Sequence, residues 1–151
     1  MTTNQLLAIL PEMAEMKSQP EKLLTEPLET NKWSIREIVG HLFYWDKFNL
    51  EVMVPKMVDG AALPPFPDLD AHNAEGIQYI NKFASAEVVM DAFIRTRKEF
   101  AEKMDSLDPE MSFQIEGESV SFMPASFAEI FIEHDAHHLR QMHRFLLGKV
   151  R

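Results

Sequence analysis

The sequence predicts an all-α fold, a four-helix bundle whose helices are joined by long crossover loops. Four tracts of the chain place apolar residues three and four positions apart, which is the period of a helix with one buried face. The alternation of apolar and polar residues that marks strands is nearly missing. Two connections, 19–32 and 110–124, are long enough to run the length of a bundle, so we expect the crossovers there.

The first two helices are predicted at about residues 4–18 and 34–58. In the first, Pro11 either introduces a kink or marks a late start, because proline cannot donate a backbone hydrogen bond. The second opens on a capping box, in which Ser34 caps the helix and Glu37 reaches back to it. Pro55 is expected to bend its last turns and Gly60 to end it.

The second half of the chain is predicted to hold a short helix, a long helix, a small hairpin and a final long helix. Asp70 is expected to cap the short helix, which runs to about residue 83 after a proline-rich loop. Ser85 caps the long helix that continues to about residue 107. A hairpin is expected within 113–122. Ser126 reads as the start of another capping box, and Gly148 as the end of the final helix.

Composition limits the classes of partner and compartment. The 151 residues, 46% of them hydrophobic, suit a single domain over 1–151. A net charge of −9 argues against nucleic acid, whose binding depends on clustered basic residues. The chain has no cysteine, no signal-like start and no uninterrupted apolar run of the ~18 residues that a membrane span needs. We therefore expect a cytoplasmic protein that binds neither nucleic acid nor membrane.

Three histidines on core-facing stripes are candidate metal ligands. His134 and His138 are four residues apart in the final helix and so project from nearly the same face, whereas His143 lies opposite. His41 lies on the apolar stripe of the second helix. Burying neutral imidazoles is costly unless each finds a partner, and one divalent metal would serve all three. Three protein ligands would leave a coordination position for water or substrate.

His137, at the edge of the stripe, has two interpretations. It either bonds Glu133 or Gln141 at a helix seam, or it contacts substrate or supports a ligand beside the metal. Gln141 is also placed to orient an imidazole. The remaining alternative is that all of these histidines are ordinary core or surface residues. The Glu-x-x-His pairs of a di-iron bundle are incomplete here, and no serine carries the signature of a catalytic triad.

Two segments resemble the motifs of the DinB/YfiT-like superfamily. Residues 33–42, WSIREIVGHL, resemble its tryptophan-led second helix, and residues 133–142, EHDAHHLRQM, resemble its C-terminal histidine motif. The order, the spacing and the chain length also match, although many relatives have a glycine before the glutamine where this chain has Leu139-Arg140. The resemblance implies a down-up-up-down bundle, often dimeric, with one divalent ion held by His41, His134 and His138.

Function follows less directly from the resemblance. Some branches resemble metal-dependent hydrolases that use activated water, and others resemble S-transferases of a low-molecular-weight thiol. A thiol cofactor would need cations for its carboxylates, and Arg36, Arg140 and Arg144 are the candidates. We expect zinc or nickel as the ion, a small-molecule substrate and a homodimer. The alternative is a non-catalytic metal-binding or sensing bundle.

Overall fold

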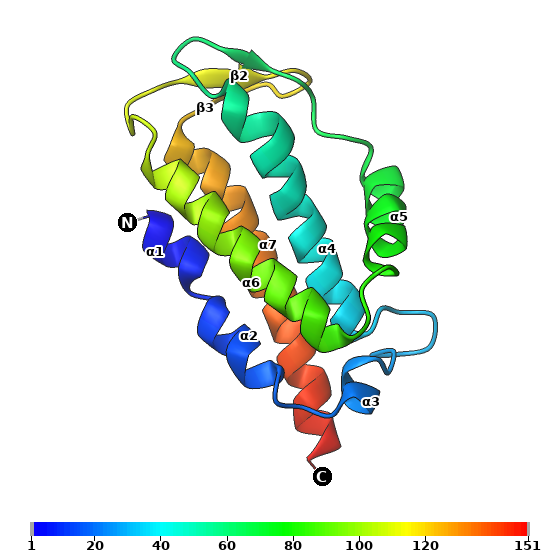
Figure 1. Ribbon diagram of the computed structural model, residues 1–151. Helices are drawn as coiled ribbons and strands as arrows, with labels where there is room; N and C mark the ends of the chain where they lie inside the picture. The colour runs from blue at the N-terminus through cyan, green and yellow to red at the C-terminus, as the bar shows by residue number, and fades with distance from the viewer. Residues whose placement is uncertain (1, 151) are drawn as a thin grey trace.

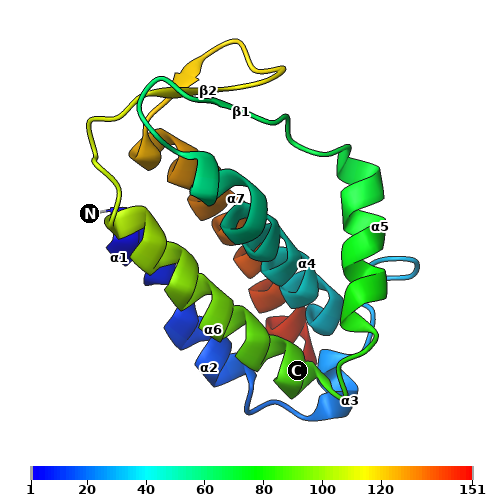
Figure 2. The same cartoon turned by 45° about the horizontal axis from the view of Figure 1, so that its top comes forward.

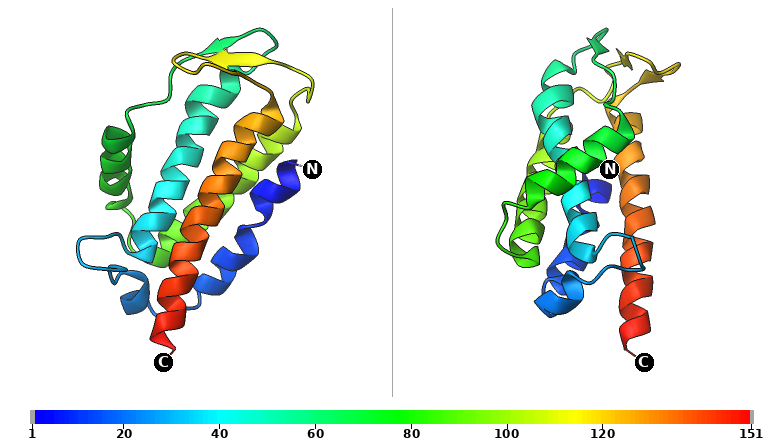
Figure 3. Two further views of the ribbon diagram at one scale, coloured as in Figure 1. Left: turned by 180° about the vertical axis from the view of Figure 1, so that it is seen from behind. Right: turned by 90° about the vertical axis from the view of Figure 1, so that its right-hand side faces the viewer.

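Four lengths of helix lie side by side in the computed structural model, which describes residues 2–150. They run down, up, up and down in the order of the chain, so the predicted all-α bundle topology is confirmed (Figure 1). Figure 3 shows the first length beside the last one. The elements are α1 (Thr2–Leu7) with α2 (Leu10–Met16), α4 (Ile35–Phe48), α6 (Ala86–Asp105) and α7 (Pro124–Lys149).

The first helix is interrupted before Pro11. Pro11 lies in the first turn of α2, where its missing N–H breaks no helical hydrogen bond. The connector that follows contains a short helix, α3 (Glu21–Leu24). The Glu21 carboxylate accepts the backbone N–H of Ala86 at 3.0 Å and so ties this connector to the start of α6.

The second helix begins as predicted and then changes its pitch. Ser34 Oγ accepts the Glu37 N–H at 3.2 Å while Glu37 accepts the Ser34 N–H at 3.0 Å. Beyond Phe48 the chain continues as a π-helical turn, η1 (Asn49–Met53), and a 3-10 turn, η2 (Val54–Lys56). Pro55 lies in that last turn, where it cannot continue the α-helical hydrogen bonds.

The crossover is the segment 57–85, between the two parallel helices α4 and α6. It carries β1 (Ala62–Leu63) and α5 (Leu69–Ile80) back along the outside of α4 (Figures 1 and 2). The expectation of crossovers at 19–32 and 110–124 was wrong, because those segments join adjacent ends of antiparallel helices. Asp68, not Asp70, caps α5, and its carboxylate accepts the Ala71 N–H at 3.0 Å.

A small sheet covers one end of the bundle (Figure 2). The predicted hairpin is present as β2 (Phe113–Ile115) and β3 (Ser121–Phe122), which pair antiparallel. The strand β1 of the crossover adds to β2 in parallel, with Ala62 opposite Gln114. The sequence did not predict this third strand, which anchors the crossover to the top of the bundle.

The predicted start is correct for α6 and wrong for α7. Ser85 caps α6 as expected and accepts the Val88 N–H at 3.2 Å. The final helix starts three residues earlier than expected, because Pro124 takes the first helical position. Ser126 therefore lies inside the first turn, where its hydroxyl accepts the Met123 N–H at 3.0 Å. Gly148 does not end α7, which runs on to Lys149.

Glycines let α5 approach α4 closely. A Cβ at Gly40 would overlap the Ile80 side chain and lie 3.0 Å from its Cγ2, and a Cβ at Gly76 would lie 3.1 Å from the Tyr44 Cβ. This close approach holds the second half of α5 against the middle of α4. Figure 3 shows α5 crossing α4 on the outside of the bundle.

The apolar core is divided into two clusters with a polar layer between them. On α6, Arg97 separates Phe93 of one cluster from Phe100 of the other, and on α7 the buried Asp135 lies between Phe131 and Met142. The histidines lie at this same level of the bundle. Among residues 2–150, no helix combines the length and the apolar character that crossing a membrane requires.

Candidate metal centre

The structure brings together the three histidines that the sequence proposes as ligands. His41 projects from α4, and His134 and His138 project from successive turns of α7. Their Nε2 atoms are 3.0 Å apart for His41 and His134, and 3.1 Å apart for His134 and His138. One ligand atom from each ring lies within 4.8 Å of the others. These separations suit a single ion with bonds of ~2 Å.

The chemistry of these nitrogens fits a cation. A neutral imidazole nitrogen carries either a proton or a lone pair, so the Nε2 of His134 makes one good hydrogen bond at most. It nevertheless approaches two other ring nitrogens at hydrogen-bond distance. One of the two contacts is therefore poorly matched unless a positive ion accepts the lone pairs. Among the described residues, this is the donor set that suits a divalent ion.

Burial keeps these rings neutral. Burial, together with a smaller effect of the neighbouring histidines, lowers the pKa of His41 to about 3 and the pKa of His134 to about 4. Burial also lowers the pKa of His138. At neutral pH each ring therefore retains a lone pair that can bind a metal.

Gln141 fixes the orientation of His138. The Oε1 atom of Gln141 lies 2.8 Å from Nδ1 of His138 and accepts its proton. With the proton on Nδ1, the Nε2 lone pair of His138 points toward the other two histidines. Such a support for a ligand ring is typical of metal sites. The position of Gln141, three residues beyond His138, matches the orienting role suggested from the sequence.

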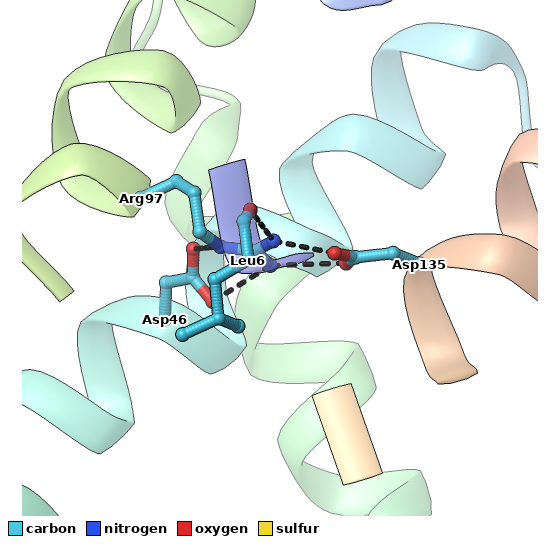
Figure 4. Close-up of polar contacts among 4 residues, drawn as sticks. All are labelled: Leu6, Asp46, Arg97 and Asp135. Atoms are coloured by element: carbon cyan, nitrogen blue, oxygen red, sulfur yellow. Dashed lines mark hydrogen bonds and ion pairs between the residues drawn. The ribbon is translucent and has the colours of Figure 1, made fainter. Parts of the chain in front are cut away.

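A buried charged network, drawn in Figure 4, includes Asp135, which follows His134 in the sequence. Arg97 of α6 donates Nε–H to Asp46 of α4 at 2.8 Å and an Nη2 proton to Asp135 of α7 at 3.0 Å. It donates further bonds to the same two carboxylates and one to the Leu6 carbonyl at 3.0 Å, so all five guanidinium donors are used. Burial raises the pKa of Asp46 to about 6, against the opposing effect of Arg97.

Sequence reasoning missed this network, although a signal was present. Asp46 is fully buried and Arg97 is 1% exposed. Each of the three charged residues falls on the apolar face of its helix, where Asp135 stands between the ligands His134 and His138. A charge on a buried face needs a partner, so three such charges on three helices are a sign of one shared network.

The other residues proposed from the sequence do not join the cluster of three histidines. His137 is exposed, and its ring lies 5.0 Å from that of His138, centroid to centroid. Arg36 donates to the carbonyls of Ile80 and Phe83, so it joins α4 to the end of α5. Arg140 is exposed. His143 contacts Glu12 at 3.0 Å on the surface, as its place opposite the stripe predicts.

His72, left without a role by the sequence, is a packing residue. It is 4% exposed, and its ring centroid lies 4.2 Å from that of Trp45. It helps fix α5 on α4.

Two pockets meet at the histidine cluster. The histidine pocket, of about 980 Å³, has all three candidate ligands in its wall together with His137 and Glu133. The C-terminal pocket, of about 710 Å³, lies between the 28–33 loop and the end of α7 and is lined by Gln141 and Arg144. His138 and Trp33 line both pockets. All three candidate ligands therefore line the histidine pocket, whereas only His138 of the three lines the C-terminal pocket.

Comparisons with known proteins agree with this architecture. Residues 2–142 match the family model of the DinB superfamily. No curated protein shows significant similarity to the chain. Among solved structures, YfiT from Bacillus subtilis, described as a probable metal-dependent hydrolase with an unusual four-helix bundle topology, is similar with a TM-score of 0.66 and 14% identity, over 93% of this chain and 82% of that one. That likeness shows the same fold, and the family match over nearly the whole length shows that the chain belongs to the DinB superfamily.

Proposed function

We propose that the protein is a metal-dependent hydrolase of small molecules, with one divalent ion held by His41, His134 and His138. The observation that carries the proposal is the convergence of three neutral imidazoles, two buried and one half-buried, whose Nε2 atoms cannot all satisfy one another. The fold it shares with YfiT, described as a probable metal-dependent hydrolase, supports the same reaction class. Zinc and nickel both suit nitrogen ligands.

The chain's own residues supply the rest of the chemistry. When bound, a divalent ion acidifies water and polarises the oxygen of an electrophile. Glu133 and His137 line the histidine pocket beside the ligands, and in this proposal they take the proton that the attacking water loses. Gln141 keeps His138 aimed at the cluster.

An S-transferase of a low-molecular-weight thiol is the second candidate. It is favoured by the C-terminal pocket, where Lys32 and Arg144 lie in the wall that also contains His138. These cations would hold the carboxylates of a thiol whose sulfur is ionised at the cluster. Of the three arginines proposed from the sequence for this role, Arg144 alone lines that pocket among the described residues. The small-molecule substrate and the homodimer that the resemblance implies stay proposals.

Metal content tests the proposal first. Elemental analysis of the purified protein is expected to find about one divalent ion per chain. His138→Ala is expected to abolish binding, because it removes one of three ligands, whereas His143→Ala on the opposite face of α7 is expected to retain the ion. A protein that binds no ion, or a His138→Ala variant that binds as well as the wild type, would contradict the proposal.

A substrate screen then separates the reaction classes. The metal-loaded protein is assayed with chromogenic esters and amides, and separately with thiols and a chromogenic electrophile. Hydrolysis that is lost in His138→Ala supports the hydrolase, and thiol-dependent turnover that is lost in Arg144→Ala supports the transferase. An ion with closed coordination, shown by cobalt spectra that no added ligand perturbs, would support the non-catalytic binding or sensing alternative instead.

A further inference from the structure

We infer that the side chains lining the histidine pocket favour small molecules that combine an apolar body with a protonated amine. The inference deepens the proposed function, on which it rests for the statement that the occupant is a substrate. The binding preference itself stands on the shape, the apolar wall and the charge of the pocket.

The wall of the pocket is largely apolar and partly uncovered. Trp45 and Phe131 form its deeper part, being 6% and 4% exposed. Leu69 and Ile130 line the pocket as well, but they are 61% and 38% exposed. A ligand that covers these exposed apolar side chains removes apolar surface from water, and this removal favours binding. The volume of about 980 Å³ is at the upper end of the range for small-molecule sites.

The charge in the wall is negative throughout. Asp68 at the start of α5, Glu118 of the hairpin and Glu133 of α7 line the pocket, and none of the residues that line it is a lysine or arginine. All three carboxylates are exposed, and within residues 2–150 none of them forms an ion pair. Asp68 also accepts the Ala71 N–H as the cap of α5. A carboxylate ligand would meet three like charges, whereas an ammonium group is attracted by each of them.

The C-terminal pocket has the opposite character. Lys32, Arg144 and Lys149 line it, with Glu29 as its one acid. Because His138 stands between the two pockets, the structure separates an anion-binding side from a cation-binding side at the same cluster. An anionic group is therefore better placed in the C-terminal pocket, and the apolar cation in the histidine pocket.

The two tryptophans provide a direct readout of binding. The chain has only Trp33 and Trp45, and both line the histidine pocket. Trp45 does not line the C-terminal pocket. In the variant Trp33→Phe, the fluorescence of Trp45 alone therefore reports a ligand in the histidine pocket and not in its neighbour.

The experiment compares three probes of the same shape. Purified protein of measured metal content is titrated with para-butylbenzylamine, para-butylbenzyl alcohol and para-butylbenzoate, and fluorescence gives each Kd. In the metal-free His138→Ala variant, the amine is expected to bind about 10-fold more tightly than the benzoate at low salt, with the alcohol between them, because the three carboxylates remain. A bound divalent ion would add two positive charges beside them, so a smaller difference is expected in the loaded protein.

A matched pair of double variants tests the cause. Asp68→Asn with Glu118→Gln removes two charges from the wall and keeps the helix cap, since asparagine caps as well as aspartate. It is expected to weaken amine binding about 3- to 10-fold and to leave the alcohol unchanged. Asp70→Asn with Glu116→Gln removes the same charge from exposed neighbours outside this pocket, and is expected to change the Kd less than 2-fold.

The outcomes keep the two proposals apart. Benzoate binding as tight as amine binding in the His138→Ala variant, or equal effects of the two double variants, would overturn the inference and leave the metal proposal standing. An amine preference in a protein that binds no metal would uphold the inference and refute the hydrolase. No fluorescence change with any probe would overturn the inference, because Trp45 would then have no ligand beside it.

Discussion

His41 and His138 are buried and His134 is half-buried, and all three imidazoles must stay neutral in the folded protein. Their positions were predictable, because histidine on an apolar stripe at a spacing of four residues is visible in the sequence. The buried charged network could not be predicted in this way. Asp46, Arg97 and Asp135 come from three helices, and only the packing of those helices shows that one guanidinium satisfies both carboxylates. Gln141 was suggested from the sequence, since its contact with His138 is local.

The lowered pKa values of the histidines predict a loss of stability in acid for the metal-free protein. The unfolded chain takes up protons near pH 6.5, whereas folded His41 and His134 do so only near pH 3 and pH 4. Stability is therefore expected to fall as the pH drops from about 6.5 to about 4, by up to ~1.4 kcal/mol per pH unit for each histidine. Urea unfolding with a chelator present, at several pH values, measures this slope.

The control is the double variant His41→Gln with His134→Gln. Asp46 titrates in the opposite sense, because its raised pKa lets the folded state take up a proton first as the pH falls below about 6. That contribution is common to both proteins, so the difference between the two slopes isolates the histidines. Equal slopes would refute the prediction.

At the scale of single elements, the caps show where local sequence suffices and where it fails. Ser34 and Ser85 cap their helices as predicted, because the capping pattern involves only neighbouring residues. Ser126 fits the same pattern, yet Pro124 starts the helix earlier because its fixed φ already matches a first helical residue. The strand β1 has two residues and pairs with β2, about fifty residues away, so no local signal marks it.

The close contact of α4 with α5 makes opposite predictions for two glycines. Gly40→Ala is expected to destabilise the protein by about 1–2 kcal/mol, since strain against Ile80 outweighs the better helix propensity of alanine. Gly148→Ala, with no atom within 4 Å of the new Cβ, is expected to stabilise it by about 0.5–1 kcal/mol. Chemical denaturation of both variants measures the changes. A Gly40→Ala protein more stable than the wild type would contradict the prediction, because α5 would then shift away from the new methyl group without a loss of packing energy.

At the scale of the whole molecule, one side chain joins all four lengths of helix in the bundle. Arg97 of α6 bonds to α4 through Asp46, to α7 through Asp135 and to α1 through the Leu6 carbonyl. The bundle itself was predictable from four amphipathic tracts. The place of its crossover was not, because all three connections between those tracts exceed ten residues and length alone does not show which pair of helices is parallel.

Removal of Arg97 is expected to be severe. Arg97→Met leaves two carboxylates buried without their shared partner, and we expect a loss of about 3–5 kcal/mol in the free energy of unfolding. Lys17→Met, which breaks an ion pair whose side chains are 32% and 44% exposed, is the control and is expected to cost less than about 1 kcal/mol. Denaturant titration compares the two. Similar costs would mean that the buried carboxylates are neutralised by protonation instead.

The buried network also restricts how this family member can change through evolution. If Arg97 is lost first, two buried carboxylates remain without a cation. If one aspartate is lost first, the buried guanidinium loses one of its two carboxylate partners. An apolar replacement of all three positions would be stable, yet every single-step path to it crosses a poorly folded intermediate. We therefore expect the three positions to change together or not at all.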